Sequence, residues 1–442
     1  MRQAWRKYLS TVAPRYTSYP STVQFSGNIS EADYAAKLMS VPVYEPLTID
    51  VRLPFNHAAC WCSDCDTHVE PQYSRAAPYI DMVLKEISTV GSLLRGHGRP
   101  TSIHLTGEAP NYFPAAGLER IVTRIEDVLG LTDNAQMAIE LDARLLKSGD
   151  VSALKTLGFS RMNLSVKEFD GNIQTLINRT QPFELIARCV DDMREAGVDD
   201  VCIDLQYGLP KQTPERFAQT IQKAISLAPD RISILEYAPW RESVSEMAET
   251  ASSLPDATER AQLVEVANQA LEAGGFRRIG FDNYARPGSA LLKAAQAGRL
   301  HRNMHGFTDE IGDTVVGIGM SAVSYVDGLY VQNAQTLGAY ANAIADGGLA
   351  TAQGLNRSAR DNIAAQTISR LLCTFTTDIS AILPHLTEQE TRGMMRALDR
   401  FEEDGVIERR ANIVHLFDDA YDLCRRVATA IDPQFLKQNT FQ

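Results

Sequence analysis

Short apolar segments alternate with amphipathic segments over residues 47–285, and this alternation restricts the fold more than any other feature of the sequence. The apolar segments are rich in β-branched residues and leucine, as expected of strands that are buried on both faces. Strict alternation of strands and helices predicts a parallel sheet with right-handed crossovers, either a barrel or a doubly wound sheet. The expected strands are 48–51, 102–105, 136–140, 161–165, 200–204 and 231–237, with helices at 78–95, 117–129, 148–157, 184–196 and 214–227.

Polar and charged residues stand where several of these strands end. Gly107 follows the second expected strand, Glu140 ends the third, Lys167 follows the fourth and Asp204 ends the fifth. Ligands bind at the carboxyl ends of the strands in barrels and doubly wound sheets, so these residues predict one shared site. Taken singly, each charged residue could instead be a helix cap or part of a surface ion pair.

Three cysteines, Cys60, Cys62 and Cys65, lie within six residues directly after the first expected strand. Thiols this close together are typical of metal sites. Their spacing, C-x-C-x2-C, fits no common zinc ribbon. A zinc site completed by His57 or His68 is one alternative that the residue types leave open.

The last part of the chain has a different pattern, with helices expected at 335–347, 359–374, 387–404 and 418–432. A short two-strand wing near 405–416 follows the third of these helices, which is typical of a small winged-helix-type module. No basic recognition face accompanies it, and the formal net charge of the chain is −12. We therefore expect no binding to nucleic acid.

The composition favours a cytoplasmic protein. Apolar residues make up 44% of the chain and charged residues 22%, as in soluble globular proteins. The seven cysteines have no even framework spacing, which fits a reducing cytosol. No apolar run reaches the roughly 18 residues of a membrane-spanning helix, so we expect no membrane span.

Three further motifs extend the analysis to the family level: Pro14-Arg-Tyr-Thr-Ser-Tyr-Pro20, Asp204-Leu-Gln-Tyr-Gly-Leu-Pro-Lys-Gln-Thr-Pro214 and Leu300-His-Arg-Asn303. With them, residues 14–435 resemble the oxygen-independent coproporphyrinogen III oxidases, which are radical S-adenosylmethionine (SAM) enzymes. The resemblance implies an α/β fold with a radical-SAM-type parallel β/α barrel, a partial form of the TIM barrel. The implied parts are an N-terminal arm at 1–46, the barrel domain at 47–330, and a small, mostly helical, winged-helix-like C-terminal domain at 331–442.

The cysteine loop departs from the family pattern at two of the three cluster positions. The family loop reads Pro-Phe-Cys, three residues, Cys, two residues, Cys, one residue, Cys; here Asn56, Cys60, Ser63 and Cys65 occupy these positions. Thiolates hold a [4Fe–4S] cluster, whereas asparagine offers a neutral amide and serine a hydroxyl. We therefore expect the cluster and the radical chemistry to be lost. The alternative is a displaced cluster on Cys60, Cys62 and Cys65.

The SAM positions implied by the resemblance are only partly kept. The family has three glycines in the turn after the second strand, where this chain has Thr106, Gly107 and Glu108. Asp50 and Arg52 replace a tyrosine and a histidine of the first strand. We expect weak SAM binding or none, and hence no bound cofactor. The positions that correspond to SAM contacts are Gly107, Glu140, Lys167, which replaces a glutamine, Arg179, Asp204, Ala238 and Val323.

Four basic residues, Arg15, Arg286, His301 and Arg302, lie in segments that match the family closely. The family's substrate carries four propionates, and guanidinium groups pair well with carboxylates. The resemblance therefore implies that these residues bind a tetrapyrrole. The arginines could instead only brace the N-terminal arm, which is either a structural strap or an arm that closes over the substrate.

We predict an oxidase-like protein of porphyrin and heme biosynthesis that has lost the cluster and keeps a role in binding a tetrapyrrole or a protein partner. The alternative is an active oxidase that decarboxylates two propionates of coproporphyrinogen III to vinyl groups.

Overall fold

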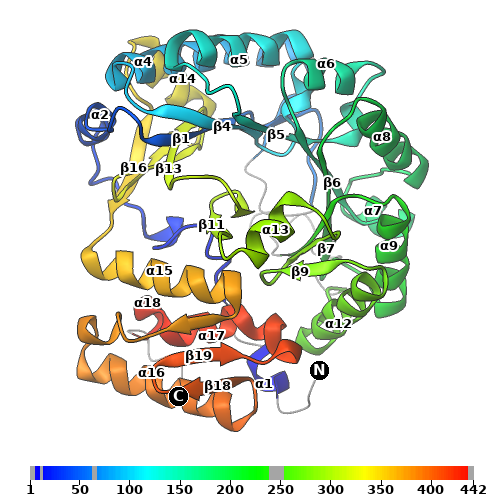
Figure 1. Cartoon of the computed structure of the whole chain (residues 1–442). Helices are drawn as coiled ribbons and strands as arrows, with labels where there is room; N and C mark the ends of the chain where they lie inside the picture. The colour runs from blue at the N-terminus through cyan, green and yellow to red at the C-terminus, as the bar shows by residue number, and fades with distance from the viewer. Residues whose placement is uncertain (1–4, 10–12, 62–66, 238–252, 437–442) are drawn as a thin grey trace.

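A twelve-stranded sheet that curves into an open, partial barrel forms the centre of the molecule (Figure 1). The computed structural model describes residues 5–9, 13–61, 67–237 and 253–436. Seven neighbouring strands run parallel, and all six predicted strands are among them. In sheet order they are β13 (Thr314–Ile318), β1 (Pro46–Arg52), β4 (Arg99–Thr106), β5 (Gln136–Leu141), β6 (Arg161–Lys167), β7 (Asp200–Tyr207) and β8 (Arg231–Glu236).

Antiparallel strands extend this parallel region at both ends. Beyond β13 lie β14 (Val323–Val326), β15 (Leu329–Asn333) and β16 (Thr351–Asn356), and beyond β8 lie β10 (Asn283–Ala285) and β9 (Arg277–Ile279). The helices that cover the outside are α4 (Pro78–Leu94), α5 (Ala115–Leu129), α6 (Asp150–Thr156), α8 (Phe183–Glu195), α9 (Pro214–Ser226), α12 (Ala257–Ala273) and α14 (Leu337–Ala345). The predicted helices over 78–227 are confirmed, and the partial barrel decides between the two folds that the alternation allowed.

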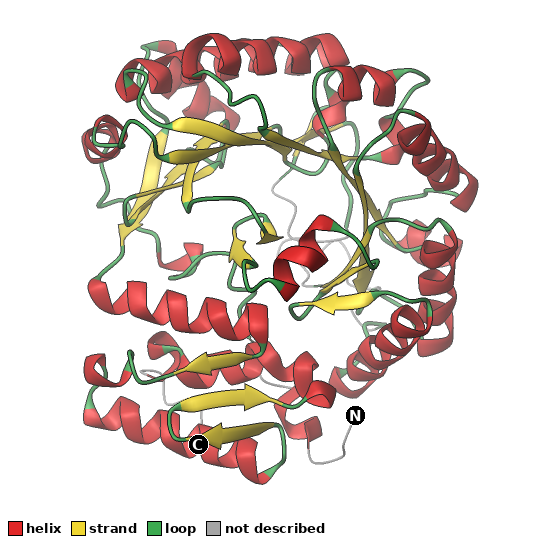
Figure 2. Ribbon diagram, in the orientation of Figure 1, coloured by secondary structure: helices red, strands yellow, loops and turns green. Residues whose placement is uncertain are grey.

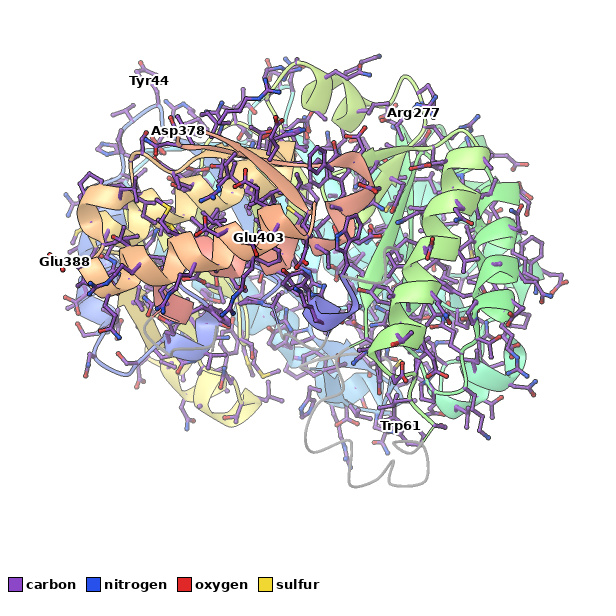
Figure 3. The ribbon with its side chains drawn as sticks, turned by 90° about the horizontal axis from the view of Figure 1, so that it is seen from below. Tyr44, Trp61, Arg277, Asp378, Glu388 and Glu403 are labelled. Atoms are coloured by element: carbon purple, nitrogen blue, oxygen red, sulfur yellow. The ribbon has the colours of Figure 1, made fainter. Side chains whose placement is uncertain are left out.

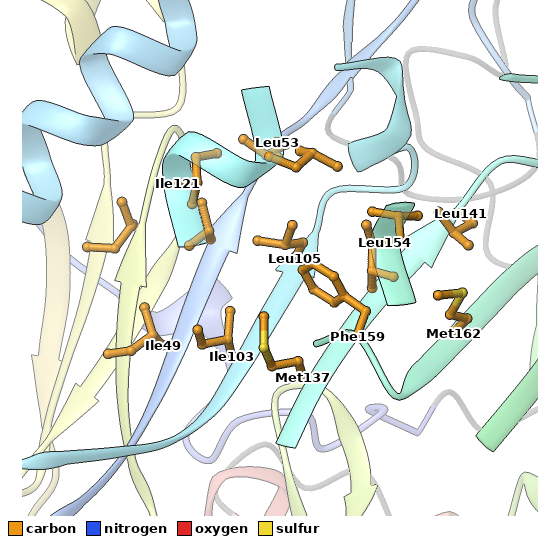
Figure 4. Packing of buried hydrophobic residues seen from close by; sticks show 14 of the residues in the cluster. Ile49, Leu53, Ile103, Leu105, Ile121, Met137, Leu141, Leu154, Phe159 and Met162 are labelled. Atoms are coloured by element: carbon orange, nitrogen blue, oxygen red, sulfur yellow. The ribbon is translucent and has the colours of Figure 1, made fainter. Parts of the chain in front are cut away.

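Alternation along each strand separates a dry outer face from a polar inner face. In β1, Ile49 and Val51 are fully buried, and they belong to the large core under the outer helices. Figure 4 shows the packing of Ile49 with Ile103, Leu105 and other apolar residues of the neighbouring strands. Side chains one residue out of step, such as Asp50, project to the other face, because successive residues of a strand point to opposite sides. The inner face of the sheet is therefore free to carry a polar site.

The C-terminal region forms a second core of its own, and Figure 2 shows its three-stranded sheet below the barrel. The predicted helices and the wing are confirmed in type and position. The elements are α15 (Ala359–Thr374), β17 (Thr376–Asp378), α16 (Glu388–Glu403), β18 (Ile407–Arg410), β19 (Ile413–Leu416), α17 (Cys424–Ile431) and α18 (Pro433–Leu436).

The domain boundary predicted at residue 330 falls within β15, and both the barrel sheet and its core continue beyond it. β16 pairs with β15 over residues 351–356, and the second core takes its first residue after the arm from α15, at Ala364. We therefore propose to place the boundary between Asn356 and Ala359. This proposal rests on the antiparallel strands that extend the barrel sheet beyond residue 330.

The N-terminal arm joins the barrel to the C-terminal region. Its elements are α1 (Arg6–Leu9), a short 3₁₀ turn at Thr22–Gln24 and α2 (Glu31–Met39). Trp5 is buried in the C-terminal core, and its indole donates to the carbonyl of Asp404 over 2.9 Å. The hydroxyls of Tyr16 and Tyr19 donate to the Asp432 carboxylate over 3.1 and 2.8 Å. These contacts support the strap, and an arm that closes over the substrate stays a prediction.

Among the described residues, no helix is both long and apolar enough to cross a membrane.

Candidate functional site

A cavity of about 470 Å³ lies on the inner face of the partial barrel. Its walls come from the parallel strands, from the arm at Arg15 and Thr17, and from the hairpin of β11 (His301–Asn303) and β12 (Gly306–Thr308). Figure 1 shows this hairpin within the curve of the sheet. The cavity brings together six residues predicted for the site: Gly107, Glu140, Asp204, Val323, Arg15 and Arg302.

The turn after β4 is closed by a carboxylate from the neighbouring strand. Glu140 accepts hydrogen bonds from the backbone amides of Gly107 and Glu108 over 3.0 and 2.9 Å. Gly107 has a φ of 107°, and a Cβ there would meet the Leu53 backbone at 2.8 Å, so only glycine fits. Burial, together with the charges of Glu108 and Asp204, raises the pKa of Glu140. Glu140 therefore provides the hydrogen-bond acceptor for both amides of the turn. Glu108 lines the cavity.

Two departures from the family pattern pair with each other. The ammonium of Lys167 lies 3.6 Å from the Glu108 carboxylate, and Lys167 is almost fully buried. A third departure, Thr106, donates to Asp50, itself a departure, over 2.8 Å. Burial raises the pKa of Asp204, against the nearby positive charge of Lys167. Glu140, Lys167 and Asp204, three of the positions predicted for SAM contacts, thus interact with charges and hydrogen-bond partners of the protein itself.

Arg179 does not line the cavity, which argues against its predicted contact with a cofactor carboxylate. Its side chain is fully buried, and it donates to the carbonyl of Ser165 through Nη2 over 2.7 Å. Its Nη1 lies 3.3 Å from the carboxylate of Asp142. Burial opposes the charge on Asp142, but Arg179 and Arg144 outweigh it and lower the pKa of Asp142 to about 2. Arg179 thus ties the end of β6 to the segment after β5.

At the first cluster position stands Asn56, in β2 (Phe55–Asn56), which pairs with β3 (His68–Val69). The Asn56 side chain is buried, and its oxygen accepts a hydrogen bond from the backbone amide of His57 over 2.8 Å. A neutral amide oxygen that is already hydrogen-bonded does not fit the role of a cluster thiolate. Cys60 is partly buried and disulfide-bonded. Of the two described cluster positions, Cys60 keeps the family's cysteine, whereas Asn56 does not fit a thiolate site.

Several predicted residues lie outside the described part of the chain: Cys62, Ser63, Cys65 and Ala238. The displaced cluster thus stays a prediction. His57 is exposed, whereas the His68 ring packs edge-on to Phe55 at 5.2 Å between centroids. Among the described residues, no group of three His, Cys, Asp or Glu side chains is arranged to hold a metal ion. Trp61, labelled in Figure 3, donates its backbone amide to the carbonyl of Ile177 over 3.0 Å.

Arg302 is a guanidinium at the cavity wall that has no carboxylate partner in the described part of the chain. It lies over the rings of Phe281 and Phe307, at 4.8 and 4.7 Å from their centroids. Its Nη2 donates to the carbonyl of Arg15 over 3.1 Å and its Nε to that of Tyr16 over 3.4 Å. It forms no ion pair with any described residue, and burial lowers its pKa. Arg302 therefore braces the arm and also keeps donors for a ligand carboxylate.

The other predicted basic residues separate from one another. Arg15 lines the same cavity and donates to the backbone carbonyl of Glu236. His301 lines a neighbouring cavity of about 520 Å³ between the hairpin and α15. Arg286 is exposed, donates to the carbonyl of Ala228 over 3.2 Å and lines neither cavity. Of the two predicted arginines in the 280–305 segment, Arg286 and Arg302, only Arg302 is positioned to meet a ligand in the barrel.

A histidine cluster in the cavity was missed by the sequence analysis. His104 Nε2 lies 2.6 Å from Glu310 Oε1, and the rings of His104 and His305 stack at 4.3 Å between centroids. Burial alone would lower the pKa of His104, but Glu310 and Asp50 outweigh it, so the pKa is raised. His104 lowers the pKa of Glu310 to about 2, against the effect of burial. A polar residue at an inward position of β4 was the only signal that could have revealed the cluster.

We expect the Glu310→Gln variant to lose about 1.5–3 kcal/mol of stability near pH 6, because a charged hydrogen bond is removed. The raised pKa of His104 means that its stabilisation is complete below its unfolded pKa of about 6.5 and is lost as the pH rises through the folded pKa. The Glu310 contribution is complete above about 4.3 and is lost as the pH falls towards its folded value. Urea unfolding from pH 5 to 9 should show a loss of stability above pH 6.5 in the parent but not in the variant. If the free energy of unfolding depends on pH equally in the two proteins, the pairing of His104 with Glu310 is contradicted.

Comparison with known proteins agrees with this geometry. Residues 60–224 match the radical SAM superfamily. The oxygen-independent coproporphyrinogen III oxidase of Paracoccus denitrificans is 33% identical over 82% of this chain and 80% of its own length. The structure of coproporphyrinogen III oxidase from Escherichia coli, described as a radical SAM enzyme, superposes with a TM-score of 0.88 at 29% identity, covering 95% of this chain and 97% of that one.

The match extends over almost the whole chain. The oxygen-independent coproporphyrinogen III oxidase of Bradyrhizobium diazoefficiens is 33% identical over 95% of this chain and 94% of its own length. Both the barrel and the C-terminal region lie within such an alignment, as the sequence motifs predicted. This protein therefore belongs to the family of oxygen-independent coproporphyrinogen III oxidases.

Proposed function

We propose that this chain binds a propionate-bearing tetrapyrrole of the coproporphyrinogen III class in its central cavity, without the cluster-based radical chemistry of its family. The observation that carries the proposal is Arg302, a half-buried cation that lines the cavity and has no carboxylate partner among the described residues. Leaving a buried charge unpaired is costly, so a ligand carboxylate is the natural partner. The names of the relatives support this substrate class.

A second guanidinium supports the same reading. Arg52 ends β1 at the cavity wall, and its Nε is buried without a hydrogen-bond partner among the described residues. Together with Arg15 and Arg302 it gives the cavity three arginines that form no ion pair with any described residue. Two or three guanidinium–carboxylate pairs of about 1.5–3 kcal/mol each are enough for micromolar binding.

The proposed loss of radical chemistry rests on Asn56 and on the remodelled turn. Asn56 supplies no thiolate, and a [4Fe–4S] cluster needs thiolate ligands. Four of the residues at SAM positions, Gly107, Glu140, Asp204 and Val323, still line the cavity, so they could hold SAM. The Glu108–Lys167 pair occupies the same region, and we propose that it weakens SAM binding.

Fluorescence titration with coproporphyrin III tests the proposal. We expect Arg302→Ala to weaken binding at least tenfold, because one charged contact is worth more than the 1.4 kcal/mol that corresponds to a factor of ten. Arg52→Gln should also weaken binding, and Arg52 has no bond to the arm, so its effect cannot come from loss of bracing. Binding by the parent should weaken as salt rises.

Arg286→Ala is the matched control, since Arg286 is exposed and lines neither cavity. It should bind coproporphyrin III as the parent does. If Arg302→Ala lowers the melting temperature while Arg52→Gln binds like the parent, the arginine only braces the arm and the proposal fails.

The second candidate is an active oxidase with a cluster displaced onto Cys60, Cys62 and Cys65. The high identity to relatives that bear the oxidase name favours it. Iron content separates the two candidates.

A further inference from the structure

A third, small cavity of about 50 Å³ lies between the barrel and the C-terminal region. Its walls come from β8, from α12 with Arg260, from α17 with Arg425 and Arg426, and from Arg15 of the arm. A cavity needs a volume of about 10–15 Å³ to hold one buried water. The cavity therefore has room for a few water-sized groups, which is the size of one carboxylate or phosphate.

The acidic residues around this cavity are mostly paired. Glu236 is hydrogen-bonded by Arg425. Asp422 lies 2.8 Å from the guanidinium of Arg278 and accepts from the amide of Asn268 over 2.9 Å. Asp282 remains, and it accepts a hydrogen bond from the side chain of its neighbour Asn283. Asp282 thus forms no ion pair with any described residue, and it lines the cavity together with Arg15, Arg260 and Arg426.

Arg426 is the most informative of these three cations. Its Nε is buried and has no hydrogen-bond partner among the described residues. It also forms no ion pair with any residue that the structure describes, and it neighbours a second cation, Arg425. Burial and the charge of Arg425 lower the pKa of Arg426, whereas Glu236 and Asp422 act against this shift. The charge of Arg426 is therefore only partly compensated by the protein.

We propose that this cavity binds one small oxyanion, a carboxylate or a phosphate, between Arg426 of α17 and Arg260 of α12. A guanidinium presents its donors in a fork that matches two oxygens of such an anion. Arg15, Leu235 and Asp282 line both this cavity and the central one, so the anion site lies beside the proposed tetrapyrrole site. Because its two main arginines come from the barrel and from the C-terminal region, a bound anion would link the two.

Thermal unfolding of the full chain tests the site, with phosphate or propionate replacing chloride at constant ionic strength. We expect at least one of the two anions to raise the melting temperature saturably. An increment from phosphate identifies a free anion as the ligand, and an increment from propionate alone identifies a carboxylate side arm. If neither anion gives an increment, the proposal is overturned.

Two variants and one control locate the effect. Arg426→Gln should weaken binding of the anion at least tenfold. Its melting temperature in chloride should be unchanged or higher, because a partly compensated charge is removed from the protein interior. Arg260→Gln should also weaken binding of the anion, and it provides the test if Arg426→Gln fails to fold. Arg277→Gln, at the exposed arginine labelled in Figure 3, should keep the full increment. An increment that survives in both cavity variants would overturn the site even if coproporphyrin III binds.

Discussion

After anaerobic reconstitution with iron and sulfide, the parent chain is expected to hold far fewer than the roughly four irons of a [4Fe–4S] cluster. The reason is the donor set: Asn56 is a buried amide whose oxygen is bonded to the backbone amide of His57, and Ser63 stands at the third position. Iron analysis, absorbance and electron paramagnetic resonance after dithionite reduction measure the outcome. About four irons and a reducible cluster signal would instead establish the displaced cluster.

The double variant Asn56→Cys/Ser63→Cys is the matched gain-of-function test. It places cysteine at positions 56 and 63, beside Cys60, and so restores the three cysteines of the family pattern. The rest of the barrel is unchanged. We expect it to bind close to four irons under the conditions in which the parent does not. If the double variant also stays free of iron, the loss has spread beyond the ligands, to the remodelled turn with Glu108 and Lys167.

The sequence was sufficient for the barrel because its signal is local. Each buried strand, such as Ile49 with Val51 in β1, is short and apolar, and each is followed by an amphipathic helix. We propose a later domain boundary than the predicted one, because antiparallel strands such as β16 can extend a parallel sheet without any local sign in the sequence.

The site was harder to predict because it depends on directions and on distant pairs. Arg286 and Arg302 stand in equally well-matched segments, yet only Arg302 projects into the barrel. His104 and Glu310 are 206 residues apart, so no local pattern joins them. In the sequence, Glu108 and Lys167 are two separate departures from the family pattern. The fold shows that their opposite charges pair with each other.

Replacement of Arg179 is expected to have the largest effect on stability. The sequence predicts a cofactor contact for this residue, and in the described part of the chain its partners are the Asp142 carboxylate and the Ser165 carbonyl. Removing one partner of a buried ion pair costs about 3–5 kcal/mol. Since Arg144 still holds Asp142, at 2.6 Å, we expect Arg179→Met to lose about 3 kcal/mol, the lower end of that range. Urea unfolding measures this loss.

The acid dependence of the same variant identifies the partner. The folded pKa of Asp142 is about 2, below its unfolded value of about 3.9, so its stabilisation is present above 3.9 and is lost as the pH falls through 2. The difference between parent and Arg179→Met should therefore shrink as the pH falls from 5 towards 2. Arg120→Met is the control, because Arg120 pairs with Asp81 on the surface and such pairs contribute little. If Arg179→Met unfolds like the parent but binds SAM more weakly, the stability prediction is wrong and Arg179 contacts the cofactor.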